Sequence, residues 1–232
     1  MSARQFAGTC LVLAAGLLTG CSPDPAVTEP ADARITFNRG SGGEPDTLDP
    51  HRNEETSGAA MLRDMFEGLV TEDVDLNVVP GAAERWEISD DGTLYTFFLR
   101  SDARWSNGDR VTASDFVAGL RRSVSPETAS TYAQLLLPIA NAGSVIRGEL
   151  PPESLGVAAI DELTLTIELA SATPYFIQLL AMPQTLPIHG PRYAEHGEAF
   201  ARPGNLVSNG AFRLTEWVVN SHIRLERNEH YH

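Results

Sequence analysis

The chain has 232 residues, of which 42% are hydrophobic, so it can build one large domain or two small ones around a packed core. It carries 31 acidic residues against 17 lysines and arginines, and all 17 are arginine. The formal charge of −14 repels phosphate backbones, which argues against nucleic-acid binding. Both cysteines, Cys10 and Cys21, lie near the N-terminus, so the folded part can hold no disulfide, cysteine-ligated metal or cysteine nucleophile.

Residues 1–20 predict a signal peptide. Arg4 precedes an apolar run from Cys10 to Leu18, which is too short for a permanent membrane-spanning helix and suits a cleaved signal. The sequence LTGC that ends at Cys21 resembles the lipobox of bacterial lipoproteins, in which the cysteine thiol is lipidated and anchors the mature protein to a membrane. The alternative is an ordinary secretory signal with a fortuitous cysteine. Residues 21–33 are rich in proline and acidic side chains, as a tether would be.

The globular part is expected to begin with a strand at 34–38, followed by an acidic, proline-rich loop. Apolar residues then recur at helical spacing between Ala60 and Leu69, which predicts a helix from Ala60 to Val70 with Ser57 as its cap. Residues 71–81 contain turn-forming residues and are expected to be turns.

The rest of the chain alternates between strand and helix patterns. Alternating apolar residues bounded by turn signals predict strands at 83–88, 93–100, 157–160, 163–169, 211–217 and 222–227. Helical spacing predicts one helix that is capped by Thr112 or Ser114 and ends near 123–126, and further helices at 129–137 and 174–182. This mixture favours an α/β fold with mixed sheets.

Sequence motifs for catalysis and metal binding are missing. The chain has no phosphate-binding loop, no zinc-protease helix with its paired histidines, and no GxSxG motif of serine hydrolases. His230 and His232 are expected to be an exposed chain end. The aromatic residues between 86 and 105 are expected to pack in the core, although aromatic side chains also line ligand clefts. We therefore predict no catalytic residue, no metal site and no cofactor.

A series of short segments between about residue 34 and residue 232 carries a more specific signal. They are LDPH at 48–51, RDMFEGL at 63–69, PGAAE at 80–84, YTFFLR at 95–100, WSNG at 105–108, VTASDF at 111–116, ASTYA at 129–133, PYF at 174–176, NLVSNGAF at 205–212, WVVN at 217–220 and LERN at 225–228. In this order they resemble the family 5 solute-binding proteins of ABC importers, and within them the oligopeptide-binding proteins.

The resemblance implies a periplasmic-binding-protein-like α/β fold (type II, cluster C) with two lobes, in proteins of roughly twice this length. On that basis residues 34–65 and 190–232 belong to the first lobe and residues 66–189 form a small inserted domain. The second lobe is largely missing, so the chain reads as truncated. A chain that ended at residue 232 would bind peptides weakly or not at all, because half of the cleft would be absent.

The resemblance also implies the function. The protein is expected to be an extracytoplasmic or periplasmic lipoprotein that captures oligopeptides and delivers them to the ABC permease, and that catalyses no reaction. In such relatives the ligand lies extended between the lobes, with its backbone paired to protein strands. The corresponding contact residues are Glu54, Glu55 and Thr56, the aromatic Tyr132, and Met182. Glu55 stands where these relatives have glycine and Met182 where some have histidine, which leaves the side-chain preference open.

Several alternatives remain. The ligand could be a dipeptide, a nickel chelate or a sugar, because most pocket residues of the family lie in the second lobe. The chain could also belong to an accessory sensor lipoprotein, which co-purification with permease subunits would distinguish from a transporter component. From another class, an envelope hydrolase would reveal itself by turnover of a peptide library.

Overall fold

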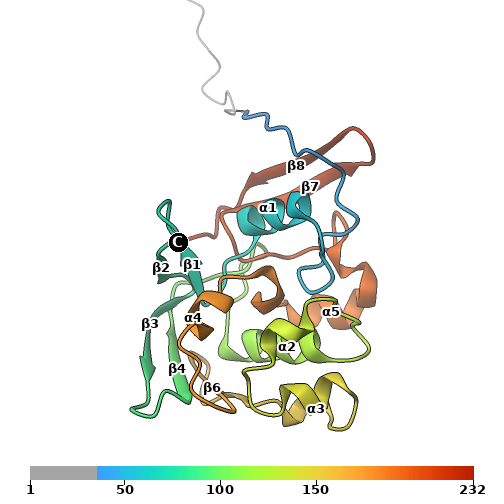
Figure 1. The fold of residues 1–232 in the computed structure, drawn as a ribbon. Helices are drawn as coiled ribbons and strands as arrows, with labels where there is room; N and C mark the ends of the chain where they lie inside the picture. The colour runs from blue at the N-terminus through green and yellow to red at the C-terminus, as the bar shows by residue number, and fades with distance from the viewer. Residues whose placement is uncertain (1–35) are drawn as a thin grey trace, which may run out of the picture. The chain divides into compact units, whose positions relative to one another are not determined.

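The computed structural model describes residues 36–232, so the predicted signal peptide, Cys21 and the tether lie outside the described residues. The chain divides into two units, residues 1–40 and residues 41–232. Residues 36–40 have no regular secondary structure, so the strand expected at 34–38 is wrong for the part that is described. All described helices and strands belong to the second unit (Figure 1).

The largest sheet has four strands: β3 (Ala83–Ile88), β4 (Leu94–Leu99), β5 (Val157–Ala159) and β6 (Thr164–Glu168). Their order is β3-β4-β6-β5, and these strands confirm the predictions for 83–100 and 157–169. Along β4, every second residue is buried, which is the alternation that one-sided packing requires. The expectation of mixed sheets is wrong, since every described strand pair is antiparallel. Short turns join most of these pairs, and short turns join only antiparallel strands.

Helix α2 (Ala113–Val124) packs against β5 and β6 with its apolar face, which includes the fully buried Phe116 and Leu120. Thr112 is its N-cap residue, as predicted, and the Asp115 carboxylate accepts hydrogen bonds from the Thr112 backbone N–H at 2.8 Å and its hydroxyl at 2.9 Å. The helix ends at Ser125, whose extended backbone suits the proline that follows. Local signals therefore define both ends of α2.

Helix α1 (Thr56–Met65) starts and ends earlier than predicted. Glu55 is its N-cap residue, so Ser57 lies inside the first turn and its prediction as the cap is wrong. Beyond the helix, the Asn209 side chain accepts a hydrogen bond from the Glu67 N–H at 3.1 Å and donates one to the Glu67 carbonyl at 2.8 Å. The Gly210 N–H donates to the Met65 carbonyl at 2.7 Å. The distant residues Asn209 and Gly210 thus form hydrogen bonds with the backbone groups at 65–67, where α1 ends and the chain becomes extended instead of helical.

The extended chain after α1 forms a hairpin of β1 (Val70–Glu72) and β2 (Val78–Pro80) where only turns were predicted. A second hairpin, β7 (Phe212–Val218) and β8 (His222–Arg227), confirms the strands predicted near the end of the chain. Figure 1 shows α1 lying against β7.

The remaining helices are short: η1 (Ala133–Leu136), α3 (Ala142–Ile146), η2 (Pro152–Ser154), α4 (Phe176–Leu179), η3 (Pro183–Thr185), α5 (Gly190–His196) and η4 (Gly197–Ala201), where η marks a 3₁₀-helix. Only parts of the helices predicted at 129–137 and 174–182 form. The sequence did not indicate α5, because it has no buried residue and so no apolar periodicity.

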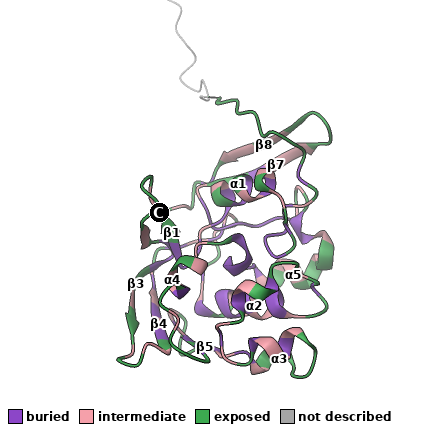
Figure 2. Ribbon diagram, viewed as in Figure 1, coloured by how far each residue is buried: buried purple, intermediate pink, exposed green. Residues whose placement is uncertain are grey.

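Buried residues line the inner faces of α1, α2 and the four-stranded sheet, while hairpin turns are exposed (Figure 2). The aromatic residues Tyr95, Phe97 and Trp105 are buried in this core, as predicted. Phe176 from α4 meets Tyr95 edge to face with ring centroids 5.1 Å apart. The core thus joins the sheet to the segment that continues to Met182.

The contact between Gly210 and α1 can be tested with two alanine substitutions. A Cβ at Gly210 would lie 2.5 Å from the Met65 carbonyl carbon, so Gly210→Ala must displace backbone and should lower the free energy of unfolding by about 1–3 kcal/mol. Gly190, where a Cβ would meet nothing within 4 Å, is the control, and Gly190→Ala should leave stability within about 0.5 kcal/mol. Equal midpoints in urea unfolding for both variants would contradict this account.

Candidate ligand-binding site

The loop from Thr47 to Asn53 precedes the predicted contact residues and closes on itself. The Asp49 carboxylate accepts the His51 N–H at 3.0 Å, and the Asp49 carbonyl accepts the Asn53 N–H at 2.9 Å. The Asn53 side chain donates to the Thr47 carbonyl at 3.3 Å. Asp49, His51 and Asn53 are all buried, so this loop is part of the interior rather than a mobile surface segment.

A buried ion pair holds this loop against α2. Both terminal nitrogens of Arg122 donate to the Asp49 carboxylate, at 2.8 and 2.7 Å, and the two side chains are 5% and 4% exposed. The guanidinium also lies over the rings of Tyr193 and Phe200, with its central carbon 4.8 and 5.2 Å from their centroids. A two-pronged bond of this kind fixes distance and orientation together.

His51 extends the network to the segment before α5. Because arginine only donates, the His51 Nδ1 accepts from Arg122 at 3.0 Å, and its Nε2 then donates to the Leu186 carbonyl at 3.0 Å. Burial lowers the pKa of His51 from 6.5 to about 4, so the imidazole is neutral at pH 7. The neutral ring with hydrogen on Nε2 is the form that both contacts require.

The segment 184–186 contacts the loop at a second point. The Gln184 amide nitrogen donates to the Asn53 carbonyl at 3.3 Å. Gly119 of α2 lets this segment approach closely, since a Cβ there would lie 2.5 Å from the Leu186 carbonyl oxygen. The loop 47–53, helix α2 and the segment 184–186 therefore form one packed unit. Glu54 is the first residue after this loop.

The predicted contact residues surround this unit. Glu54 accepts a hydrogen bond from the Thr131 hydroxyl, which places it next to Tyr132, a side chain with 41% exposure. Glu55 has an extended backbone and accepts from the Asp46 N–H at 3.3 Å. Thr56 is the first residue of α1 rather than part of a strand.

Met182 is 37% exposed and lies two residues before Gln184, so the Gln184–Asn53 bond connects its segment to Glu54. The structure thus brings Glu54 to Thr131, the residue before Tyr132, and it relates Met182 to Glu54 through Gln184. Sequence reasoning missed Thr131 and Gln184. Thr131 lies within a recognised segment, 129–133, whereas nothing in the sequence indicates Gln184.

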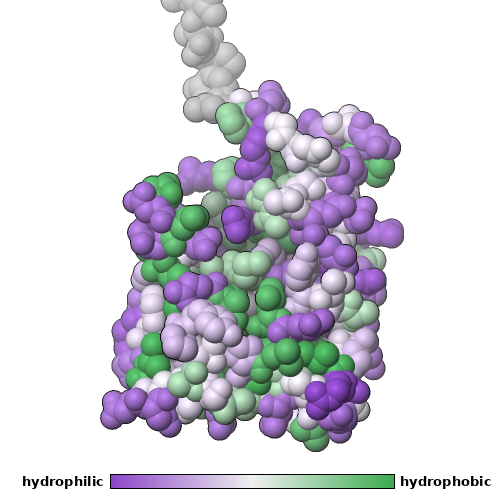
Figure 3. All heavy atoms as spheres, viewed as in Figure 1, coloured by the Kyte–Doolittle hydropathy of each residue, from purple (hydrophilic) through white to green (hydrophobic). Residues whose placement is uncertain are grey.

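A hollow of about 310 Å³ is lined by Ala181 and Pro183, the two chain neighbours of Met182, but not by Met182 itself. It lies between the end of α1, strand β1 and residues 181–186, and its lining includes Arg63, Phe66, Leu76, Ala181 and Pro183. On the face drawn in Figure 3, apolar side chains gather in the middle, where Figure 1 draws α2 and α4, with hydrophilic side chains around them. This face offers apolar contact area in addition to the polar groups near Glu54.

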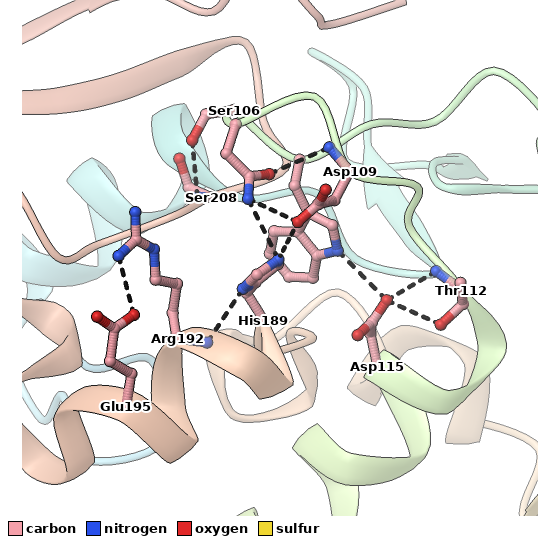
Figure 4. Close-up of polar contacts among 10 residues, drawn as sticks. Ser106, Asp109, Thr112, Asp115, His189, Arg192, Glu195 and Ser208 are labelled. Atoms are coloured by element: carbon pink, nitrogen blue, oxygen red, sulfur yellow. Dashed lines mark hydrogen bonds and ion pairs between the residues drawn. The ribbon is translucent and has the colours of Figure 1, made fainter.

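A second polar network fixes the start of α5 (Figure 4). His189 donates from Nε2 to the Asp109 carboxylate at 2.9 Å and accepts the Arg192 N–H on Nδ1 at 3.2 Å. The bond from His189 lowers the pKa of Asp109. Asp115 accepts the Trp105 indole N–H at 3.2 Å, and burial raises its pKa. All of these groups are matched donors and acceptors within the fold, so the network has a structural role.

Glu67 is a third buried polar group, at the point where α1 gives way to the extended chain. Its carboxylate accepts the Tyr231 hydroxyl at 2.8 Å and lies 3.6 Å from the His232 Nε2. Burial raises the pKa of Glu67 to about 7. His230 and His232 are exposed residues, as predicted, although the His232 imidazole itself packs beside Glu67.

Comparison with known proteins shows the family. The model of the bacterial extracellular solute-binding proteins, family 5 (Middle), matches residues 77–232. The chain belongs to this family. The predicted membership and the periplasmic-binding-protein-like α/β fold are therefore confirmed.

Two curated relatives of this family 5 chain come from Escherichia coli (strain K12). The chain is 42% identical over 227 residues to the periplasmic oligopeptide-binding protein OppA, which covers 97% of this chain and 41% of OppA. It is 43% identical over 209 residues to the probable deoxycholate-binding periplasmic protein YgiS, which covers 89% of this chain and 39% of YgiS. These relatives are binding proteins rather than enzymes.

Among solved structures, the chain is similar to Haemophilus influenzae OppA in complex with RPPGFSPFR, at 40% identity and a TM-score of 0.80. The match covers 82% of this chain and 38% of that one. The family 5 chain thus spans about 40% of the length of these relatives.

Within residues 36–232 no helix is long and apolar enough to cross a membrane, and no cluster of three or more histidine, cysteine or acidic residues is suited to a metal ion. The predicted lipidation of Cys21 lies outside this range.

The buried ion pair predicts a large loss of stability when one partner is removed. Asp49→Asn leaves the buried Arg122 guanidinium with only the half-exposed Glu198 carboxylate, 3.6 Å away, and should lower the free energy of unfolding by about 3 kcal/mol. The double variant Asp49→Leu with Arg122→Met removes both charges and should recover most of that loss. The control is Glu87→Gln, which breaks the exposed Arg85–Glu87 pair and should cost less than about 1 kcal/mol. Equal losses for Asp49→Asn and Glu87→Gln would refute the role of the pair.

Glu67 and His51 predict opposite dependences of stability on pH. The folded state holds the Glu67 proton more tightly than the unfolded chain, with a pKa of about 7 against 4.5, so this contribution is complete below pH 4.5 and lost as the pH rises to 7. His51 has a folded pKa of about 4 against 6.5, so its contribution is present above pH 6.5 and lost as the pH falls to 4. The two slopes oppose each other over the shared window.

The single variants separate the two effects. Relative to the unaltered protein, the stability of Glu67→Gln should rise by roughly 3 kcal/mol from pH 4.5 to 7, because the amide stays neutral. His51→Gln should show a relative gain of similar size as the pH falls from 6.5 to 4. Urea unfolding at several pH values measures both, and parallel pH profiles of all three proteins would contradict the assignment.

Proposed function

We propose that this chain is part of an extracytoplasmic substrate-binding protein that captures oligopeptides and delivers them to the permease of an ABC importer. Support comes from its identity of about 40% to several proteins named OppA, one of which was solved with a peptide. Within the chain, the observation that supports the proposal is the hydrogen bond between Glu54 and Thr131, because it links the 54–56 segment to the residue before Tyr132. The proposed role is binding without catalysis.

The chemistry around Glu54 suits a peptide of variable sequence. The Glu55 carbonyl accepts the Ala59 N–H at 2.9 Å, so its extended backbone is proposed to pair with a peptide backbone through its N–H. Such bonds do not depend on the ligand's side chains. The exposed parts of Tyr132 and Met182 supply apolar and aromatic contact area beside it.

We assign residues 34–65 and 190–232 to the first lobe and residues 66–189 to an inserted domain. The end of α1 supports a boundary at Phe66. There the backbone changes from helical to extended, and the Asn209 side chain forms two hydrogen bonds with the backbone of Glu67. A second lobe, for which the greater length of the relatives leaves room, would form the opposite wall of the cleft.

The proposal includes an anchor. Lipidation of Cys21 after removal of residues 1–20 would tether the protein at the outer side of a membrane, as the LTGC sequence suggests. In cell fractionation, Cys21→Ser should move the protein from the membrane to the soluble fraction. An unchanged membrane fraction would exclude this anchor.

A bile acid is a second candidate ligand, because the chain is 43% identical to a protein named as a probable deoxycholate-binding protein. Identity alone does not distinguish the two ligand classes. Calorimetric titration of the product of the complete reading frame with tri- to pentapeptides and with deoxycholate decides between them. Saturable heat from peptides alone supports the proposal, and heat from deoxycholate alone replaces it.

Tyr132 provides the test within the site. Tyr132→Ala removes an exposed ring from the residue after Thr131, the hydrogen-bond partner of Glu54, and should weaken peptide binding by about tenfold or more. The control Ile160→Ala removes an exposed apolar side chain at the turn between β5 and β6 and should leave affinity unchanged. A fragment of residues 36–232 alone should bind weakly or not at all. Unchanged affinity of Tyr132→Ala would remove Tyr132 from the site.

A further inference from the structure

Within residues 36–232, Gln184 is a buried amide whose nitrogen is hydrogen-bonded and whose oxygen is not. The residue is 3% exposed, and its Nε2 donates to the Asn53 carbonyl at 3.3 Å. Its Oε1 is buried and has no hydrogen-bond partner among the described residues. An unpaired buried carbonyl oxygen costs roughly 1–3 kcal/mol, which offsets what the single hydrogen bond to Asn53 contributes. Stability therefore does not explain a glutamine at this position.

The hydrogen-bond partner of Gln184, the Asn53 carbonyl, explains the glutamine better. Asn53 directly precedes Glu54, and the peptide bond between them is planar, so the Asn53 carbonyl and the Glu54 N–H point in fixed, opposite directions. Whatever holds this carbonyl also sets the direction of the Glu54 N–H. The rest of Asn53 is already fixed by its bonds to Thr47 and Asp49. The bond from Gln184 completes the positioning of this peptide group.

Gln184 itself stands on a firm support. It lies in η3, where the Thr185 hydroxyl contacts the carbonyls of Leu180 at 2.9 Å and Met182 at 2.8 Å. The next carbonyl, that of Leu186, accepts from His51. The segment that carries Gln184 is thus bonded to the loop 47–53, and Gln184 in turn holds Asn53, the last residue of that loop. Such mutual support is expected of a preorganised site.

We propose that Gln184 is a positioning residue for the ligand: through the Asn53 carbonyl it orients the backbone of Glu54 and Glu55 for pairing with a bound peptide. This inference rests on the proposed peptide-binding function. It assigns to Gln184 an effect on all peptides alike, because backbone pairing does not depend on side-chain identity.

The test uses the product of the complete reading frame with Gln184→Leu and Gln184→Met, two apolar side chains of similar size that cannot donate a hydrogen bond. The exposed Gln178 in α4 supplies the control, Gln178→Leu. Affinity is measured by calorimetry with several tri- to pentapeptides of different side chains. Amide hydrogen exchange at residues 54 and 55 and thermal unfolding are measured without ligand.

We expect both Gln184 variants to bind every peptide about tenfold more weakly, a change of about 1.4 kcal/mol, and to exchange the amides at 54 and 55 about tenfold faster. Their melting temperatures should stay close to that of the unaltered protein, because the loss of the unpaired Gln184 oxygen offsets the loss of the bond to Asn53. Gln178→Leu should match the unaltered protein throughout. Unchanged affinity and exchange in the Gln184 variants overturn the inference alone. Losses confined to particular peptides also overturn it, since they would place Gln184 in a side-chain pocket. No peptide binding by the unaltered protein overturns the proposed function, and the inference with it.

Discussion

The buried ion pair between Arg122 and Asp49 is the interaction on which the arrangement around the candidate site depends. It joins a loop near the start of the described chain to α2, and the rings of Tyr193 and Phe200 enclose the guanidinium from α5 and η4. Burying two charges costs desolvation free energy that the attraction between them does little more than offset. What the pair contributes is one geometry, because a two-pronged bond tolerates little displacement.

From this pair a series of fixed contacts leads to the proposed ligand-binding residues. His51 carries the arrangement to the Leu186 carbonyl, and Gln184 in the same segment holds the Asn53 carbonyl. Glu54 is the next residue in the chain, and its carboxylate accepts a hydrogen bond from the Thr131 hydroxyl. The residues proposed to contact the ligand thus lie at the end of a buried, rigid support, which is the arrangement that keeps contact geometry fixed before a ligand arrives.

The parts of the fold that were predicted correctly are those that local signals define. Helix α2 has its own cap, Thr112, and a proline that ends it, and β4 alternates because one face is buried. The misplaced end of α1 had no such signal: apolar spacing continued to Leu69, but Asn209 and Gly210 paired with the backbone first. Helix α5 was missed because it has no buried residue.

The sequence by itself determined the family and the hairpins of the four-stranded sheet, since these follow from local patterns and from segments recognisable one at a time. Only the tertiary structure decided that Asp49, His51 and Arg122 form one buried network and that Gln184 reaches Asn53. The physical reason is that these bonds join groups more than 70 residues apart. No local preference encodes such a pairing, which exists only once the chain has packed.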